Sequence, residues 1–162
     1  MEDLQDKVIL GIDPAIASIG YAAICNQHVL DYGVIKTTAG ENISVRLRQI
    51  HDDICELCTT LKPDVVALEM PFFTRENTNA NKVLRALGVI QLALGDSGLP
   101  DPIFLHQSQV KSAVAQYGAA KEEMQDAVAF LFKLPGPPRP DDAADALAIA
   151  YAAQLGMRAN VK

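Results

Sequence analysis

Two short apolar runs, each closed by a carboxylate, constrain the fold of this chain most strongly. The run VILGID ends at Asp13 and is broken by Pro14, and the run VVALE ends at Glu69, with Pro71 close behind. A nearly all-apolar run that follows a helical segment is typical of a buried central strand, parallel to an earlier one. Because an unpaired carboxylate at the tip of a buried strand is costly, each of these acids requires a partner.

The apolar patterning of the rest of the chain predicts a single α/β domain. Three short strands with tight connections indicate an antiparallel meander, and two further strands alternate with helices, which favours a mixed sheet flanked by helices. A chain of 162 residues is long enough for one such domain, and we expect residues 1–158 to form it and residues 159–162 to be a short tail. The strands are predicted at 8–13, 19–25, 28–36, 65–69 and 102–105, and the helices at 44–61, 82–96, 107–116, 121–133 and 142–155.

The last predicted helix opens with PDDAADAL and is otherwise built from Ala, Leu and Ile, which is typical of a buried helix. Pro140 fits the first turn and Asp141 fits the N-cap, and acids in a first turn interact favourably with the helix dipole. This explanation covers Asp141 and Asp142 but not Asp145, which lies a full turn into the helix. Asp142 and Asp145 are three residues apart and therefore share a face. Two acids on one side of a buried helix indicate a functional role.

The carboxylates at the two strand tips and on the last helix form one set of candidate site residues: Asp13, Glu69, Asp142 and Asp145. If these carboxylates converge, their mutual repulsion requires cations between them. Oxygen ligands without a neighbouring His or Cys select Mg²⁺ or Mn²⁺. Two such ions about 3.5–4 Å apart support hydrolysis of a phosphodiester, since one activates water and the other stabilises the leaving 3′ oxygen. The set therefore predicts two divalent ions per active site.

The sequence resembles the RuvC family of Holliday junction resolvases. The resemblance runs across nearly the whole chain and is carried by ILGIDPAIASIGYAAI, VVALEMPFF, QVKSAV, YGAAKEEMQ and PRPDDAADALAIA. It implies an RNase H-like fold with a five-stranded mixed sheet, and it implies that the four acids are the catalytic tetrad and the metal ligands. The family acts as a homodimer in recombination and repair, cuts two opposed strands of a four-way DNA junction, and leaves 5′-phosphate ends. The resemblance therefore implies an Mg²⁺-dependent endodeoxyribonuclease with junction DNA and a second copy of the chain as partners. Branch-migration motor proteins are a further candidate partner.

The resemblance also implies residues that contact DNA. Phe72 matches a family aromatic that stacks on unpaired bases, and such stacking contributes about 1–3 kcal/mol per base. Lys111 in QVKSAV matches a family lysine near the scissile phosphate, and Lys121 matches another, after a loop that is one residue shorter here. A core position for Phe72 and a solvated surface for the lysines are the alternative interpretations. The candidate DNA-binding residues are Phe72, Arg75, Lys82, Arg85, Lys111 and Lys121, and Arg139 would lie beside the acids.

Several features depart from the family pattern. Ala15 follows Asp-Pro where the family has Gly, and a left-handed or close-approach conformation at this position would be strained by Ala. The segment ALGVIQ lacks the Arg of the family's GQARG-like stretch, and GAAK lacks a basic residue. The net charge of −6 and the pI of about 4.9, taken alone, argue against phosphate binding. We therefore expect an active nuclease with weaker DNA binding or a changed junction preference.

A zinc site is the alternative use of one helical segment. HDDICELC places His51, Cys55 and Cys58 on one helical face, with the spacing of three zinc ligands. Because no fourth ligand is near in sequence, we favour thiols that pack as small core side chains. The three cysteines show no disulfide pattern, the N-terminus MEDLQDK is no apolar leader, and no apolar run reaches the roughly 20 residues of a membrane span. We expect a protein without a membrane partner, in the cytoplasm or an equivalent reducing, DNA-containing compartment.

Three competing functions follow from the same residues. An RNase H-like nuclease that acts on another branched DNA or on RNA would use the same metal chemistry. GIDPAIASIGYA also resembles the phosphate loop of actin-like ATPases and sugar kinases, but that fold needs two such domains, and the DAAD segment would have no role in it. A junction-binding module without catalysis would be expected to have lost an acid, and all four are present. The candidates for a dimer interface, which core burial explains equally well, are Met70, Leu84, Leu87, Val89 and Leu92.

Overall fold

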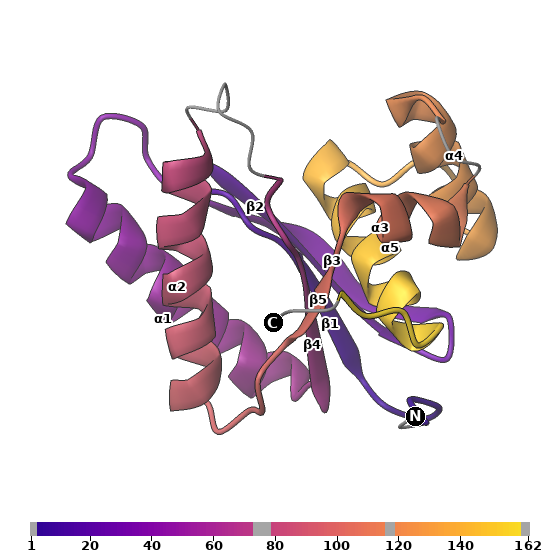
Figure 1. Ribbon diagram of the computed structural model, residues 1–162, viewed down its shortest axis with the longest axis horizontal. Coiled ribbons are helices and arrows are strands. Elements are labelled where there is room, and N and C mark those ends of the chain that lie inside the picture. The colour runs from indigo at the N-terminus through magenta and orange to yellow at the C-terminus, as the bar shows by residue number, and fades with distance from the viewer. Residues whose placement is uncertain (1–2, 73–78, 116–118, 160–162) are drawn as a thin grey trace.

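The structure of the protein is a computed structural model that describes residues 3–72, 79–115 and 119–159 (Figure 1). Its helices and strands follow the predicted order along the chain. In that order they are β1 (Ile9–Asp13), β2 (Ser18–Cys25), β3 (His28–Lys36), α1 (Ile43–Leu61), β4 (Val65–Glu69), α2 (Ala80–Asp96), β5 (Ile103–Leu105), α3 (Gln107–Val114), α4 (Lys121–Leu131) and α5 (Asp141–Gln154).

The strands form one mixed sheet with the order β3-β2-β1-β4-β5. β2 lies antiparallel to both β1 and β3, which confirms the predicted meander. β4 lies parallel to β1 and to β5, because α1 and α2 each carry the chain back before the next strand begins. The predicted five-stranded mixed sheet flanked by helices is therefore confirmed.

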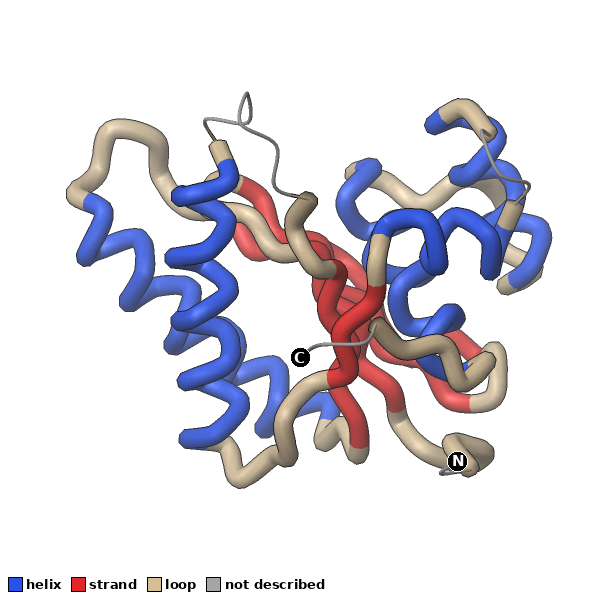
Figure 2. The backbone as a smooth tube through the Cα atoms, viewed as in Figure 1, coloured by secondary structure: helices blue, strands red, loops and turns tan. Residues whose placement is uncertain are grey.

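Helices cover both faces of the sheet (Figures 1 and 2). α1 and α2 pack on one face, over a core cluster that includes Leu10, Ile12 and Leu68. α3, α4 and α5 pack on the other face, over a cluster that includes Ile9 and Leu105. Successive residues of a strand point to opposite faces, so a strand covered on both sides must be apolar at nearly every position. This requirement explains the unbroken apolar runs before the two strand-tip acids.

The helix α5 crosses β1 and β2 at very short range. A Cβ atom on Gly11 would overlap the Ala146 carbonyl oxygen, and a Cβ atom on Gly20 would overlap the Asp142 carbonyl oxygen. The small side chains of α5 and these two glycines therefore let the helix backbone approach the strands directly. This contact fixes the height and rotation of the N-terminal turn of α5 against the sheet.

The start of α5 differs from the prediction. Asp141 is the first helical residue and Pro140 occupies the N-cap, so the prediction that Asp141 caps the helix is wrong. The Asp141 carboxylate instead forms ion pairs with Arg139 and Lys121. Its negative charge still lies in the first helical turn, where the helix dipole favours it.

The C-terminal segment returns to the sheet. The Ala159 N–H donates a hydrogen bond to the Phe104 carbonyl of β5 at 2.7 Å. Residues 160–162 lie outside the described part of the chain, as does residue 116, the predicted end of the third helix. The division into a domain of residues 1–158 and a tail therefore stays a prediction. Among the described residues, no helix has both the length and the apolar character needed to cross a bilayer.

Candidate active site

The two strand-tip acids emerge side by side at one edge of the sheet. Ile12 of β1 pairs with Leu68 of β4 in the parallel ladder. The next residues, Asp13 and Glu69, therefore leave the sheet together at the carboxyl ends of neighbouring strands. In open α/β sheets, ligands bind in the crevice outside the carboxyl ends of the strands, which is where these two acids lie.

The N-terminal turn of α5 brings two further acids to the same edge. Gly20 pairs with Asp13 in the β1–β2 ladder and also lies against the Asp142 backbone, so α5 begins beside Asp13. One carboxylate oxygen from each of Asp13, Asp142 and Asp145 lies within 4.8 Å of the other two. Glu69 lies outside this group of three but lines the same cavity as Asp13 and Asp145. The structure thus brings together all four acids that the sequence singled out.

Burial and the charges of neighbouring acids make Asp13, Glu69 and Asp145 difficult to ionise. Burial raises the pKa of Asp13 to about 8, with further contributions from the charges of Glu69, Asp145 and Asp142. Burial and then the charge of Asp145 raise the pKa of Glu69 to about 7. Burial also raises the pKa of Asp145. In the absence of a cation, the site therefore retains protons near neutral pH, and stabilising its fully ionised form requires positive charge.

The donor set fits a hard divalent cation. Asp13, Asp142 and Asp145 are the one group of metal-ligating side chains that the described residues bring this close together. All its donors are carboxylate oxygens, which is the chemistry that Mg²⁺ and Mn²⁺ prefer. The raised pKa values of Asp13 and Glu69 support the same conclusion, because a bound cation would favour the charged forms that burial disfavours. The carboxylates at this edge therefore fit a divalent metal in their ligand type, and a bound cation would stabilise their ionised forms.

A cavity of about 380 Å³ opens from the acids toward α3 and α4. Lys111 of α3 and Lys121 of α4 line it together with Asp13, Glu69 and Asp145. The charge of Lys121 opposes the rise in the pKa of Asp13, and the charge of Lys111 opposes the rise in that of Glu69. Lysine ammonium groups beside these carboxylates are an arrangement suited to an anionic substrate such as a phosphodiester.

A second cavity, of about 260 Å³, extends from the same acids toward α2. Apart from Asp13, Glu69 and Gln107, its described lining is apolar and consists of Pro14, Pro71, Phe72 and Val83. Phe72 is 74% exposed, which rules out the alternative of a core position. Gln107, at the start of α3, lines both cavities along with Asp13 and Glu69. The acids therefore lie where the cavity that contains Lys111 and Lys121 meets the apolar cavity.

Comparison with known proteins identifies the family. The family model described as Crossover junction endodeoxyribonuclease RuvC matches residues 9–153. This chain belongs to the RuvC family. It is 42% identical over 146 residues to the RuvC of Thermomicrobium roseum, covering 88% of this chain and 89% of that protein. It is 40% identical over 157 residues to the RuvC of Synechocystis, covering 94% of this chain and 93% of that protein. Membership makes the chain an endodeoxyribonuclease of this family, as the resemblance implied.

Solved structures agree with this assignment. The chain superposes with a TM-score of 0.82 and 35% identity on Thermus thermophilus RuvC in complex with a Holliday junction substrate, covering 93% of this chain and 96% of that one. It superposes with a TM-score of 0.65 and 15% identity on the yeast mitochondrial Holliday junction resolvase Ydc2, covering 96% of this chain and 84% of that one. The second likeness shows the fold alone, and both are consistent with the predicted RNase H-like fold.

The departure from the RuvC pattern at Ala15 causes no backbone strain. Ala15 is absent from the residues with a positive φ, so the left-handed conformation that would penalise Ala is not adopted there. A hydrogen bond at 2.5 Å from the Thr37 hydroxyl to the Ile16 carbonyl stabilises the loop that carries Ala15. Arg46 of α1 donates in turn to the Thr37 hydroxyl at 2.8 Å. The residue after Pro14 therefore tolerates a side chain.

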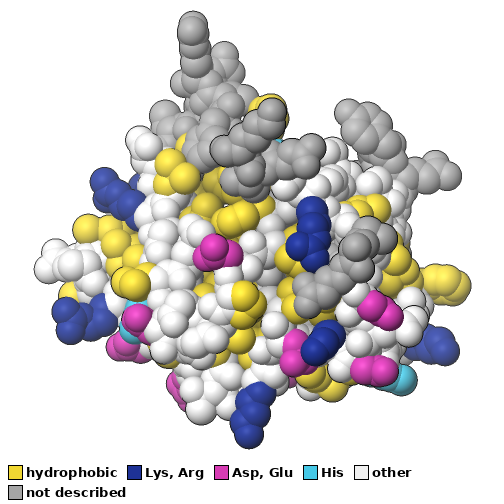
Figure 3. Space-filling view, turned by 60° about the horizontal axis from the view of Figure 1, so that its bottom comes forward, with side chains coloured by type: hydrophobic (Ala, Val, Ile, Leu, Met, Phe, Trp, Pro, Cys, Tyr) yellow, Lys and Arg dark blue, Asp and Glu magenta, His cyan; other side chains and the backbone are white. Residues whose placement is uncertain are grey.

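The remaining basic candidates are distributed unevenly. Lys82 and Arg85 are exposed on the first turns of α2, near the apolar cavity. Arg75 lies outside the described residues. Lys121 and Arg139 both pair with Asp141, the former at 3.4 Å, so their charges are partly neutralised. On the face drawn in Figure 3, the coloured Lys and Arg side chains are scattered rather than gathered in one basic patch.

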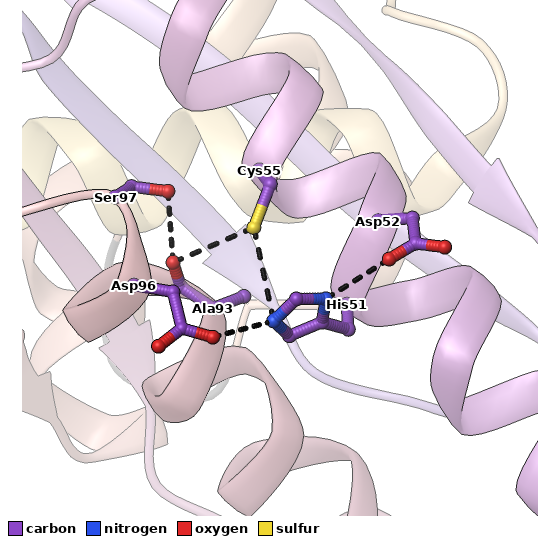
Figure 4. A network of polar contacts seen from close by, with 6 residues as sticks. All are labelled: His51, Asp52, Cys55, Ala93, Asp96 and Ser97. Carbon is purple, nitrogen blue, oxygen red and sulfur yellow. Dashed lines mark hydrogen bonds and ion pairs between the residues drawn. The ribbon is translucent and has the colours of Figure 1, made fainter.

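The histidine and cysteines of α1 form a contact between helices. His51 lies within 2.8 Å of the Asp96 carboxylate of α2 and 3.0 Å of Asp52, and the Cys55 thiol donates to the Ala93 carbonyl (Figure 4). Cys58 is buried in the core under α1 and α2. None of these residues belongs to the close metal-ligating group found among the described residues. The thiols of Cys55 and Cys58 pack in or against this core, as the preferred interpretation expected.

Two residues of the site escaped the sequence analysis. The Ser18 hydroxyl donates a hydrogen bond to the Asp142 carboxylate at 2.6 Å. Gln107 lies one helical turn before Lys111 and shares both cavities with the acids. The sequence carried a signal for Gln107, which lies four residues before Lys111 on one helix face, but none for Ser18, whose partner is 124 residues away.

Proposed function

We propose that this chain resolves four-way DNA junctions by hydrolysing phosphodiesters in two opposed strands, with Asp13, Glu69, Asp142 and Asp145 as its catalytic and metal-binding residues. The convergence of these carboxylates carries the proposal, since carboxylate oxygens of Asp13, Asp142 and Asp145 lie within 4.8 Å of one another. The Thermus relative is described in complex with a Holliday junction substrate, which supports the same choice of substrate.

The side chains around the acids have distinct roles in this proposal. The four carboxylates would hold two Mg²⁺ or Mn²⁺ ions, and these would supply the means to activate a water and to stabilise charge on the leaving oxygen. Lys111 and Lys121, which line the cavity with the acids, orient the scissile phosphate and balance its charge. The burial of Asp13 and Glu69 keeps these interactions in a poorly hydrated site, where they are stronger than in water.

The apolar cavity accommodates a base that is unpaired at the junction. Phe72 offers an exposed aromatic ring next to Pro14 and Pro71, within reach of a strand whose phosphate lies at the acids. Stacking of one base on such a ring contributes about 1–3 kcal/mol. Lys82 and Arg85, on the adjoining start of α2, are proposed to contact the flanking phosphates.

We also propose that the chain acts as a homodimer. A junction has two cleavage sites related by a twofold axis, and a symmetric dimer supplies two active sites. The face of α2 that turns away from the core supports this assembly, because Leu84 and Leu92 are 43% and 59% exposed and Gly88 between them is open to solvent. Residues at this four-residue spacing form one stripe along a helix. Leu87 belongs to the core instead, since it is only 6% exposed.

The dimer proposal is tested by placing a charge in that stripe. Leu92→Asp should shift the protein from dimer to monomer in analytical ultracentrifugation, whereas Leu155→Asp, at an exposed leucine beyond α5, should leave the dimer intact. A Leu92→Asp protein with wild-type sedimentation would overturn the assignment of this face.

The three free cysteines fit a reducing compartment, and we propose action in the cytoplasm, where branch-migration motors are candidate partners.

A cleavage assay tests the proposed function. A synthetic four-way junction with a mobile core is incubated with the protein in Mg²⁺, in Mn²⁺ or in chelator, beside linear duplex, single strand and RNA–DNA hybrid. We expect paired nicks at symmetric positions in the junction alone, with 5′-phosphate ends, and no cleavage in chelator. Asp145→Asn should abolish cleavage while retaining junction binding, and Asp101→Asn, at an exposed acid away from the site, should cleave as the wild type does.

Two other results would change the assignment. Binding of the junction without cleavage in either metal would favour a junction-binding module. Cleavage of RNA–DNA hybrids or of other branched DNA in preference to four-way junctions would keep the metal-dependent chemistry and overturn the substrate. The first result contradicts the catalytic role of the acids, and the second contradicts only the choice of nucleic acid.

A further inference from the structure

The first residue of β2 contacts one of the four acids directly. The Ser18 hydroxyl donates a hydrogen bond to Oδ2 of Asp142 at 2.6 Å, and the pair is partly buried. The two residues are 124 positions apart in the chain, so only the fold brings them together. A short bond from a hydroxyl to a partly buried carboxylate is among the stronger hydrogen bonds in proteins.

The position of Ser18 follows from the alternation of side chains along β2. Ser18 and Gly20 are two residues apart and therefore point to the same face, toward α5. Gly20 lies against the Asp142 backbone carbonyl, where a Cβ atom would overlap it. β2 thus contacts Asp142 at two points, with Gly20 against the main chain and Ser18 on the carboxylate.

The Asp142 carboxylate is turned toward the sheet rather than toward its own helix. Acids in a first turn often accept hydrogen bonds from the free N–H groups of that turn. Among the described residues, however, the donor to Asp142 is the Ser18 hydroxyl. The carboxylate that Ser18 holds in this way also supplies an oxygen to the cluster with Asp13 and Asp145.

We propose that Ser18 is a positioning residue that fixes the Asp142 carboxylate in the orientation needed for metal binding. The inference rests on the proposed function, because it assumes that Asp142 is a metal ligand. A carboxylate held by a hydrogen bond loses less conformational freedom when it binds a cation, and removal of such an outer partner typically lowers metal affinity 10–100-fold. Ser18 does not line either of the two described cavities, so in this proposal it acts through Asp142.

Calorimetric titration of the metal-free protein with Mn²⁺ tests this role without DNA. We expect Ser18→Ala to bind Mn²⁺ about 10-fold more weakly than the wild type. Ser18→Thr, which restores the hydroxyl in a residue that strands favour, should return the affinity to within about 2-fold of the wild type. Ser97→Ala is the matched control, because its partly buried hydroxyl donates to the Ala93 carbonyl at 2.8 Å, at the far end of α2.

The variant Asp142→Asn, which removes the proposed metal ligand itself, separates failure of this inference from failure of the proposed function. If the wild type binds Mn²⁺, Asp142→Asn loses binding and Ser18→Ala binds as tightly as the wild type, the positioning role is overturned and the proposed function stands. If the wild type binds no Mn²⁺, both are overturned. A loss in Ser18→Ala that Ser18→Thr does not restore would also overturn the role, since the hydroxyl would not be the cause.

Discussion

The raised pKa of Asp13 predicts that the metal-free protein loses stability as the pH rises. Its pKa is about 8 in the folded protein and 3.8 in the unfolded chain, so between these values the folded state holds a proton that the unfolded state has released. The folded state binds more protons, and the free energy of unfolding therefore falls with pH across this window. The slope from one such group is about 1.4 kcal/mol per pH unit, or about 4 kcal/mol between pH 4.5 and pH 7.5.

Asp13→Asn isolates this contribution, because the amide keeps the shape of the carboxyl group and cannot ionise. In chelator, the variant should be nearly as stable as the wild type at pH 4.5 and more stable by about 4 kcal/mol at pH 7.5. Glu69, with a pKa raised from 4.5 to about 7, adds a smaller slope that remains in both proteins. Urea denaturation followed by circular dichroism measures the free energy of unfolding at each pH.

The control for this comparison is Asp101→Asn, which removes an exposed acid outside the site and should keep the wild-type slope. Mn²⁺ at 100 times its dissociation constant should restore about 2.7 kcal/mol to the wild type at pH 7.5. Equal slopes for Asp13→Asn and the wild type, or a wild-type stability that rises with pH in chelator, would refute the account of a buried and mutually repelling cluster.

Three further variants test other parts of the site. Gly20→Ala should destabilise the protein by about 1–3 kcal/mol and weaken Mn²⁺ binding, because the new methyl group overlaps the Asp142 carbonyl. The control Gly95→Ala, in open space on α2, should change neither property. Urea denaturation measures the stability and calorimetry measures the Mn²⁺ affinity. Lys111→Ala should slow single-turnover junction cleavage at least 10-fold and leave Mn²⁺ binding intact, since its ammonium group serves the phosphate. Gln107→Ala should change the relative rates at which junctions with different bases beside the cut are cleaved in competition. Equal effects of Gly20→Ala and Gly95→Ala would contradict the role of Gly20. An unchanged cleavage rate in Lys111→Ala, or an unchanged junction preference in Gln107→Ala, would contradict the role given to that residue.

The backbone of this site was predictable because apolar patterning and chain order determine it. VILGID and VVALE are typical of buried strands, and parallel neighbours place Asp13 and Glu69 at one edge. The alanine-rich helix had to pack closely, which brought Asp142 and Asp145 to that edge. The glycines that permit this approach, Gly11 and Gly20, were not singled out, because a strand glycine shows its purpose only when the opposing helix is in place.

The side-chain contacts were less predictable because they join segments far apart in sequence. Asp141 fitted an N-cap from its neighbours alone, yet it pairs with Lys121, which belongs to another helix. Ser18 was an ordinary strand residue until α5 placed Asp142 beside it. The exposed position of Phe72 likewise depends on the loop that leaves β4, where apolarity alone equally allowed a core position.

The most direct test of the central claim is anomalous diffraction from crystals of the protein soaked in Mn²⁺. The account predicts two anomalous peaks about 3.5–4 Å apart between Asp13, Glu69, Asp142 and Asp145, with carboxylate oxygens at about 2.1 Å from the ions. Occupied Mn²⁺ sites elsewhere, such as beside His51 and Asp96, with none between these four acids, would contradict it.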